Sequence, residues 1–180
     1  MDILLKLVHN ERYNVALLNG LARHNAALMG DRPDLPLLYE SGVVYRRERI
    51  ETWSDVVWTY RQGWEDCDAL SAIRAGELIA RGGQAMRPGD AGYERCHRLK
   101  AIHAEVFLET PIETPENGPG TYHCVTRYQA VLPGRARPDL PWFVDDPSLR
   151  LGMRGGMVDR SVLARWRRLG VRPGEPLTVE

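Results

Sequence analysis

The sequence predicts an α+β domain in which helices pack on one side of an antiparallel sheet. Apolar residues at helical spacing dominate the chain up to residue 83, and apolar–polar alternation dominates two segments after residue 100. Stretches rich in proline and glycine separate these segments and mark loops. With 180 residues, 43% of them hydrophobic and 27% charged, the chain can bury its own core. We therefore expect one domain, residues 1–180.

Two helices and a short strand are predicted before the centre of the chain. A leucine stripe at helical spacing predicts a helix over 11–29 that ends at Gly30. A strand is predicted over 43–47. A short helix follows over 55–61, with Thr52 or Ser54 as its cap.

The central helix is predicted to begin at Asp66, a good N-cap residue, and to stop at Gly82 or Gly83. One face is apolar and small-sided, which suits close packing on a sheet: Ala69, Ala72, Ile73, Gly76, Ile79 and Ala80. Lying away from it are Arg74, Glu77 and Arg81, at a spacing that supports Glu–Arg pairing. Cys67 falls in the first turn, where the helix dipole and unpaired N–H groups favour a thiolate. The alternative is that Cys67 is a small buried apolar residue.

Strands are predicted over 101–109 and 121–130 from their alternation, and over 142–148 as a short strand that ends in a polar turn. Residues 110–120 hold three prolines and two glycines, so they are expected to form an exposed loop. A last helix is predicted from Asp159 or Ser161 to about Leu169.

Charge and cysteine content exclude several classes of protein. The formal net charge is zero, from 24 basic and 24 acidic side chains, so nothing predicts binding to nucleic acid or to an anionic membrane. No apolar run approaches the roughly 20 residues of a membrane span, and the first residues do not resemble a secretory signal. Three cysteines without paired spacing favour free thiols in a reducing cytoplasm.

Three residue types needed for thiol catalysis occur in order along the chain. A thiol nucleophile requires a base and a third group that orients the base. Cys67 at a helix start is followed by His123 on a strand and by Asp145 or Asp146 after the next strand. His103, also on a strand, is the competing base. Cys124 is expected to point to the opposite face of its strand from His123, into the core.

These residues carry a resemblance to a known family. Cys67 leads an alanine-rich helix that ends Leu78-Ile79-Ala80-Arg81-Gly82-Gly83, a strand-borne histidine follows, and then Trp142-x-x-x-Asp146-Pro147-Ser148. This order resembles the transglutaminase-like branch of the papain-like cysteine enzymes. A small bacteriophage and prophage group within that branch is more similar. Its members resemble this chain in four segments: 38–43, 63–67, 122–125 and 146–153. In the second of these the family members have one residue fewer. The resemblance spans about 35–155.

The resemblance implies a papain-like core, with Cys67 as nucleophile, His123 as general acid/base and Asp146 as orienting carboxylate. Asp146 is preferred to Asp145 because it precedes Pro147-Ser148, four residues after Trp142. The oxyanion hole would use the Cys67 backbone N–H, with Gln62 or Trp64 as second donor. The chain departs from the family between Gly63 and Asp66, where Glu65 and an extra residue lie, and this leaves the upstream donor open.

Acidic neighbours oppose a thiolate at Cys67. Glu65, Asp66 and Asp68 surround it, and negative charge raises the pKa of a thiol. The helix dipole contributes only about 0.3–1 kcal/mol at an exposed site. Cys67 is therefore expected to depend on a nearby imidazolium.

Three functional hypotheses follow. The first is a thiol-dependent amide hydrolase that acts on a protein or peptide through an acyl-cysteine, or a transglutaminase if an amine accepts the acyl group. It needs no cofactor, and the resemblance implies a phage or prophage protein in the bacterial cytoplasm and leaves open association with the virion or with other phage proteins. The second is a non-catalytic phage structural or assembly protein. The third is a zinc site drawn from Cys96, His97, His103, His123 and Cys124, although no Cys-x-x-Cys or His-Glu-x-x-His spacing is present.

Overall fold

The computed structural model describes residues 11–47, 52–109 and 123–153. Its elements are α1 (Glu11–Asp31), the 3-10 helix η1 (Leu38–Glu40), β1 (Val44–Tyr45), α2 (Val56–Gln62), β2 (Trp64–Glu65), α3 (Cys67–Arg81), η2 (Gly82–Ala85), α4 (Tyr93–Cys96), β3 (His103–Leu108), β4 (Cys124–Gln129), β5 (Phe143–Asp145) and α5 (Pro147–Arg150). The α+β prediction is confirmed. The predicted loop at 110–120 and the predicted last helix lie outside the described residues.

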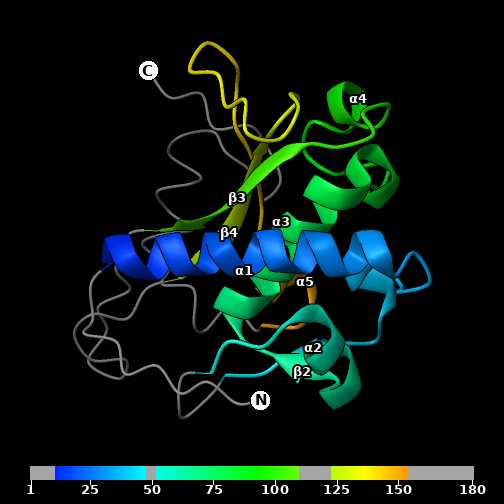
Figure 1. Ribbon diagram of the computed structural model, residues 1–180, viewed down its shortest axis with the longest axis vertical. Coiled ribbons are helices and arrows are strands. Elements are labelled where there is room, and N and C mark those ends of the chain that lie inside the picture. The colour runs from blue at the N-terminus through cyan, green and yellow to red at the C-terminus, as the bar shows by residue number, and fades with distance from the viewer. Residues whose placement is uncertain (1–10, 48–51, 110–122, 154–180) are drawn as a thin grey trace.

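The main sheet is antiparallel and has the order β3-β4-β5. His103 pairs with Gln129 at one end of the β3–β4 ladder, and Leu108 pairs with Cys124 at the other. β5 is shorter than the strand predicted over 142–148, because Pro147 begins α5 directly after it. α3 packs on this sheet, as predicted, and α1 crosses α3 in the view of Figure 1.

The small-sided face of α3 packs against a helix as well as against the sheet, which corrects the sequence-based expectation. A Cβ atom placed on Gly76 would lie 2.7 Å from the Ala22 carbonyl oxygen and 2.7 Å from Asn25 Cβ, both in α1. Ser71 is on the side of α3 that faces the sheet, and its hydroxyl donates to the Cys124 carbonyl at 3.0 Å. Because α3 is covered on several sides, Arg74 and Glu77 are also fully buried.

α1 covers the free edge of the sheet. The Asn19 side chain on α1 accepts from the Val106 N–H at 2.9 Å and donates to the Val106 carbonyl at 3.2 Å, as a neighbouring strand would. An unpaired edge strand is a template for association with other chains. The Asn19 amide satisfies this part of the β3 edge within the fold.

A second, two-stranded sheet leads into the central helix. β1 and β2 are parallel, and Tyr45 is in register with Glu65, two residues before Cys67. The cap of α2 is Asp55, which accepts from the Trp58 N–H, and not Thr52 or Ser54 as predicted. Within the part of the chain that the structure describes, no helix is both long and apolar enough to cross a bilayer.

Candidate active site

Cys67 is the first residue of α3 and is half-buried. The preceding residue, Asp66, has an extended backbone, and its side chain makes no capping hydrogen bond to the first turn. Glu65 is fully buried, and its carboxylate accepts from the Gln62 amide and from the Asp66 N–H. The thiol therefore lies at the start of a helix whose preceding segment is held by hydrogen bonds.

His123 connects the Cys67 thiol to the Asp146 carboxylate. Its Nε2 atom lies 2.8 Å from Asp146 Oδ2, and both side chains are almost completely buried. The His123 ring also hydrogen-bonds the Cys67 thiol. Because Nε2 faces Asp146, Nδ1 is the nitrogen left for the thiol. The structure thus brings together the three side chains that the sequence pointed to: Cys67, His123 and Asp146.

The β4–β5 register separates Asp146 from Asp145. Thr126 pairs with Asp145, and the Thr126 hydroxyl donates to the Ser71 carbonyl of α3 at 2.9 Å. Successive side chains on a strand point to opposite faces. Asp145 therefore shares the α3 face with Thr126, whereas Asp146 lies beyond the end of β5 as the N-cap of α5.

These contacts perturb the acidity of all three groups. Hydrogen bonds from Cys124 and then from His123 lower the pKa of the Cys67 thiol well below its usual value, against burial, which raises it. Burial lowers the pKa of His123, but the Asp146 carboxylate and Cys67 outweigh it, so the net direction is strongly upward. Both directions favour a thiolate–imidazolium pair. The expected rise in the Cys67 pKa from its acidic neighbours is therefore not the net result.

Cys124 is buried in the core, as expected, but its thiol also reaches the site. Its hydrogen bond with Cys67, followed by burial, raises the pKa of the Cys124 thiol well above its usual value. Negative charge at Asp66 and Asp68 acts in the same direction on Cys124. The pKa values of the two thiols therefore shift in opposite directions, which favours a thiolate at Cys67 and a protonated thiol at Cys124.

The candidates for a second oxyanion donor differ in what they already bind. The Gln62 amide nitrogen, which carries two hydrogens, donates to the Trp64 carbonyl at 2.8 Å and to the Glu65 carboxylate at 3.0 Å. The Trp64 ring lies under the Arg46 guanidinium, 4.7 Å from ring centroid to Arg46 Cζ. Gln62 is therefore a poor candidate, because both its amide hydrogens are engaged.

Tyr45 is a further candidate that the sequence reasoning missed. It pairs with Glu65 in β2, and its N–H donates to the Leu151 carbonyl at 2.9 Å, so it lies between the segment before Cys67 and the helix after Asp146. Burial, and then negative charge at Cys67 and Asp66, raise the pKa of the Tyr45 phenol, which keeps it protonated. Its hydroxyl makes no hydrogen bond to any residue that the structure describes. Tyr45 could have been found from the sequence only if its strand had been predicted to pair with Glu65, just before Cys67.

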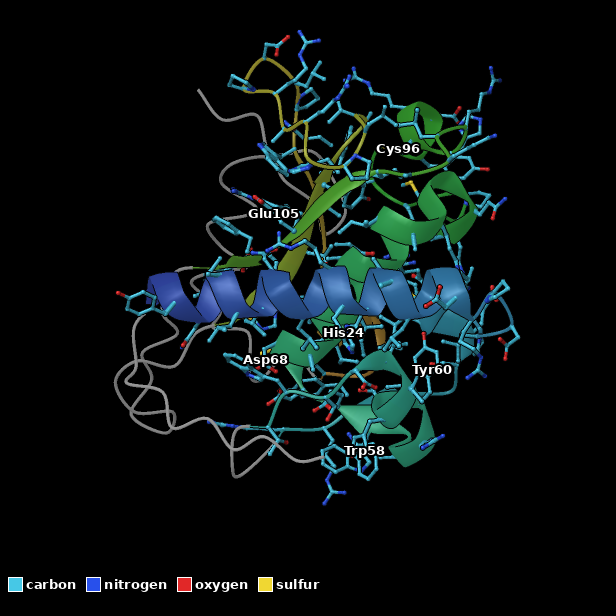
Figure 2. The ribbon with its side chains drawn as sticks, viewed as in Figure 1. His24, Trp58, Tyr60, Asp68, Cys96 and Glu105 are labelled. Carbon is cyan, nitrogen blue, oxygen red and sulfur yellow. The ribbon has the colours of Figure 1, made fainter. Side chains whose placement is uncertain are left out.

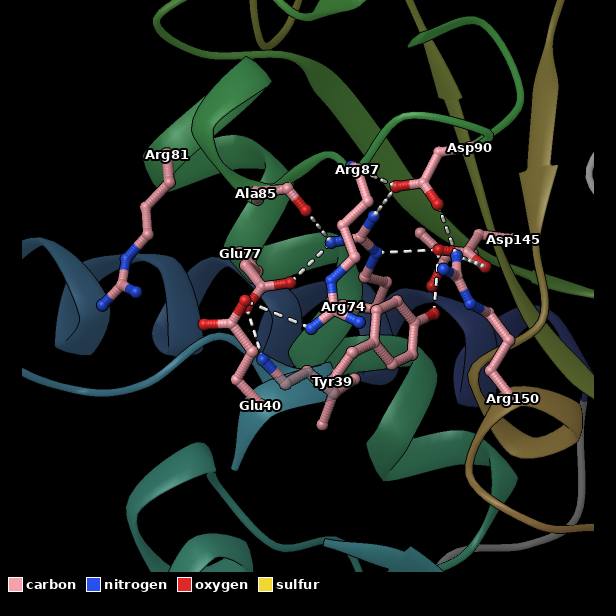
Figure 3. Close-up of polar contacts among 12 residues, drawn as sticks. Tyr39, Glu40, Arg74, Glu77, Arg81, Ala85, Arg87, Asp90, Asp145 and Arg150 are labelled. Carbon is pink, nitrogen blue, oxygen red and sulfur yellow. Dashed lines mark hydrogen bonds and ion pairs between the residues drawn. The ribbon is translucent and has the colours of Figure 1, made fainter. Parts of the chain in front are cut away.

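Asp145 belongs to a buried charge cluster centred on Arg74 (Figure 3). The Arg74 guanidinium is fully buried and contacts Asp145 at 2.8 Å, Glu77 at 2.6 Å and Asp90 at 3.4 Å. Tyr39 and Arg150 complete the partners of Asp145, at 2.8 and 3.2 Å. The predicted Arg74–Glu77 pairing is present, but in the core and not on a solvated face.

The remaining candidates lie away from this site. His103 is opposite Gln129, six residues along β4 from His123, and at about 3.4 Å per residue the two histidines are roughly 20 Å apart. His103 stacks at a tilt on Trp142 and accepts from the Gly134 N–H. Figure 2 shows Cys96 near α4, far from Asp68 in the first turn of α3. Among residues 11–47, 52–109 and 123–153, no three His, Cys, Asp or Glu side chains are grouped as metal ligands.

The aromatic residues before Cys67 do not form one group. Four aromatic residues precede Cys67 within a short stretch of the chain: Trp53, Trp58, Tyr60 and Trp64. Trp53 packs against the core, whereas the Trp58 side chain is exposed at 58% and points outward in Figure 2. The Tyr60 hydroxyl donates to the Pro36 carbonyl.

No protein-family model, curated protein or solved structure matches the chain. The resemblance to transglutaminase-like enzymes therefore depends on the motifs quoted above.

Proposed function

We propose that this protein is a thiol-dependent amide hydrolase of the transglutaminase-like, papain-like type, with Cys67 as nucleophile, His123 as general acid/base and Asp146 as orienting carboxylate. The observation that carries the proposal is the placement of the His123 ring between the Cys67 thiol and the Asp146 carboxylate. A base held by a third group and in contact with a nucleophile is the arrangement that covalent amide hydrolysis requires.

The proposed reaction has two steps. The Cys67 thiolate attacks the amide carbonyl, a C–S bond forms, and the C–N bond breaks as the His123 imidazolium gives its proton to the leaving amine. Neutral His123 then takes a proton from water, whose oxygen attacks the acyl-cysteine; a C–O bond forms, the C–S bond breaks, and the carboxylic acid and the Cys67 thiolate are released. Asp146 holds the ring and stabilises its charged form. The Cys67 backbone N–H would bind the oxyanion, with the Tyr45 phenol as a second donor.

The substrate class that follows is a protein or peptide amide. We also propose, from the motif resemblance, a phage or prophage protein that acts in the cytoplasm of the bacterial host. Hydrolysis is the simpler reaction, because water needs no second binding site.

The test is acylation by p-nitrophenyl acetate, a small activated ester, followed by peptide mapping. We expect rapid acetylation at Cys67, followed by loss of the acetyl group in the wild type, and a long-lived acetyl-Cys67 in His123→Ala. Cys67→Ala should abolish the labelling, and His103→Ala is the matched control that should leave both steps unchanged. Acetylation of Cys67 no faster than that of Cys96 would favour a non-catalytic structural protein.

A further inference from the structure

The first turn of α3 is fixed against the start of β4. Ser71 donates to the Cys124 carbonyl at 3.0 Å, and Thr126 donates to the Ser71 carbonyl at 2.9 Å. Cys67 precedes Ser71 by four residues, so the two side chains lie on the same face of the helix. These hydrogen bonds fix this face of α3 against the start of β4, where Cys124 lies.

The two thiols are in contact. They hydrogen-bond each other, and Cys67 packs against the core cluster that contains Cys124. Sulfur atoms in a disulfide lie about 2.05 Å apart, so the two side chains must turn towards each other to join. Both cysteines are free thiols in the structure.

The two thiols also differ in access. Cys67 is half-buried at the end of a helix, whereas Cys124 is only 4% exposed. An oxidant therefore meets Cys67 first, and the nearest second thiol is Cys124. A reactive thiol beside a resolving thiol is the arrangement found in redox-sensing cysteines.

We propose that Cys67 and Cys124 form a reversible disulfide when the protein meets a hydroperoxide, with Cys67 as the oxidised thiol and Cys124 as the resolving thiol. In the first step the Cys67 thiolate attacks the peroxide, an S–O bond forms and the O–O bond breaks, which oxidises the sulfur to a sulfenic acid and releases hydroxide. In the second step the Cys124 sulfur attacks the Cys67 sulfur. The S–S bond forms, the S–O bond breaks, and the Cys124 proton leaves with the hydroxide as water.

The lowered pKa of Cys67 supports the first step, since the thiolate is the reactive form. Burial raises the pKa of Cys96 to about 11, so the third cysteine is a poor competitor. The oxidation itself needs no amide substrate. We also expect the disulfide to stop hydrolysis, because it removes the Cys67 thiolate, and this expectation rests on the proposed function.

The experiment treats the full chain with an excess of hydrogen peroxide, blocks free thiols by alkylation, and maps the peptides without reduction. We expect a Cys67–Cys124 cross-linked peptide that disappears with dithiothreitol. Cys96→Ala is the matched control and should give the same cross-link. Cys124→Ala should accumulate Cys67 sulfinic acid, which dithiothreitol does not reverse; Cys124→Ser is the second variant if the alanine variant fails to fold.

Three outcomes would overturn the proposal: a Cys67–Cys96 link, Cys67 sulfinic acid in the wild type at the rate seen in Cys124→Ala, or no oxidation of Cys67. The p-nitrophenyl acetate assay on the same samples separates the two ideas. Acetylation without a disulfide contradicts only the redox proposal, and a disulfide in a protein that is not acetylated contradicts only the hydrolase. If both hold, peroxide should abolish acetylation and dithiothreitol should restore it.

Discussion

His123 Nε2 lies 2.8 Å from Asp146 Oδ2, and these residues flank two adjacent strands: His123 precedes β4 and Asp146 follows β5. The Thr126–Asp145 register places Val125 opposite the residue after Asp145, and His123 shares a face with Val125. Asp146 is therefore a diagonal neighbour of His123, within reach of its ring. One residue of slip would bring Asp145 to the position that Asp146 now occupies.

The first prediction concerns the pH dependence of Cys67 alkylation by iodoacetamide. Alkylation follows the thiolate, and each pH unit below the pKa reduces the thiolate about tenfold. The pKa of Cys67 is lowered, so its thiolate forms at a lower pH, and its rate should fall far less than that of an ordinary thiol between pH 8 and pH 6. His123, with its raised pKa, stays protonated over more of this range than a free histidine.

His123→Ala removes one of the hydrogen bonds that hold the Cys67 thiolate. Its alkylation rate should then fall steeply as pH drops, as for an ordinary thiol, while Cys96 stays slow in both proteins because burial raises its pKa to about 11. Rates are measured by mass spectrometry of each cysteine peptide. Equal rates at Cys67 and Cys96 near pH 7 would contradict the thiolate assignment.

The second prediction separates the two neighbouring aspartates. Asp146→Asn retains an oxygen that can accept from the Leu149 N–H, so the cap of α5 survives, but the charge beside His123 is lost. We expect at least about a tenfold slower alkylation of Cys67 at pH 6.5, equal to a shift of about one pKa unit. The unfolding free energy should fall by about 1–2 kcal/mol, because the buried hydrogen bond to His123 is kept but loses its charge.

Asp145→Asn is the matched comparison. It should lower the stability more than the alkylation rate of Cys67. It weakens the buried contacts to Arg74 and Arg150 and should destabilise by about 3 kcal/mol or more, because removal of one partner leaves buried charge uncompensated. Urea unfolding measures both variants. A larger loss of stability in Asp146→Asn than in Asp145→Asn would refute the division of roles.

The third prediction tests Tyr45. Tyr45→Phe removes a hydroxyl that makes no hydrogen bond within the described residues, so stability should change by less than about 1 kcal/mol. If the phenol binds the oxyanion, the acetylation rate should fall by roughly ten- to a hundredfold, while the pH profile of Cys67 alkylation keeps its shape. Tyr60→Phe, which loses only a hydrogen bond to the Pro36 carbonyl, is the control. An unchanged acetylation rate excludes Tyr45 as donor.

The fourth prediction concerns the buried charge cluster. Arg74→Met leaves Glu77, Asp90 and Asp145 without their common cation and should cost about 3–5 kcal/mol. Arg81→Met is the control on the same helix. It loses hydrogen bonds to two carbonyls near the surface, so about 1 kcal/mol is expected. Denaturant unfolding compares them, and similar losses would show that the cluster is not central to stability.

The fifth prediction tests the close approach of α1 and α3. Gly76→Ala would bring a methyl group to 2.7 Å from the Ala22 carbonyl oxygen, so the helices must separate, at a cost of about 1–3 kcal/mol. Gly20→Ala, on α1, meets nothing within 4 Å and should stabilise by about 0.5–1 kcal/mol through helix propensity. Thermal unfolding of the two variants should shift in opposite directions. Destabilisation by both would contradict this packing.

Local features of the fold were predictable because they depend on local sequence. Leucine spacing, Gly30 and Gly82 marked α1 and α3, and alternation marked β3 and β4. Boundaries were less accurate. Asp55 caps α2 in place of the residues chosen, since Thr52, Ser54 and Asp55 all have good capping side chains and only the backbone decides which of them caps.

The site was predictable only in part. Residue types and order pointed to Cys67, His123 and Asp145 or Asp146, and the motif resemblance favoured Asp146, but spacing gave no reason to bring them together. Tyr45 was missed because its position depends on a two-residue parallel pairing with Glu65. The reach of Cys124 to Cys67 was missed because alternation along a strand assigns a face and does not say which helix covers it.

By itself, the sequence determined the longer helices and strands, their order and the types of residue available for chemistry, because these follow from neighbours along the chain. Tertiary structure decided the rest. It buried Arg74 among three carboxylates, although its helical position alone favoured solvent. The β4–β5 register also gave Asp145 to that cluster and Asp146 to His123, because adjacent residues on a strand face opposite sides and only pairing fixes which side each one faces.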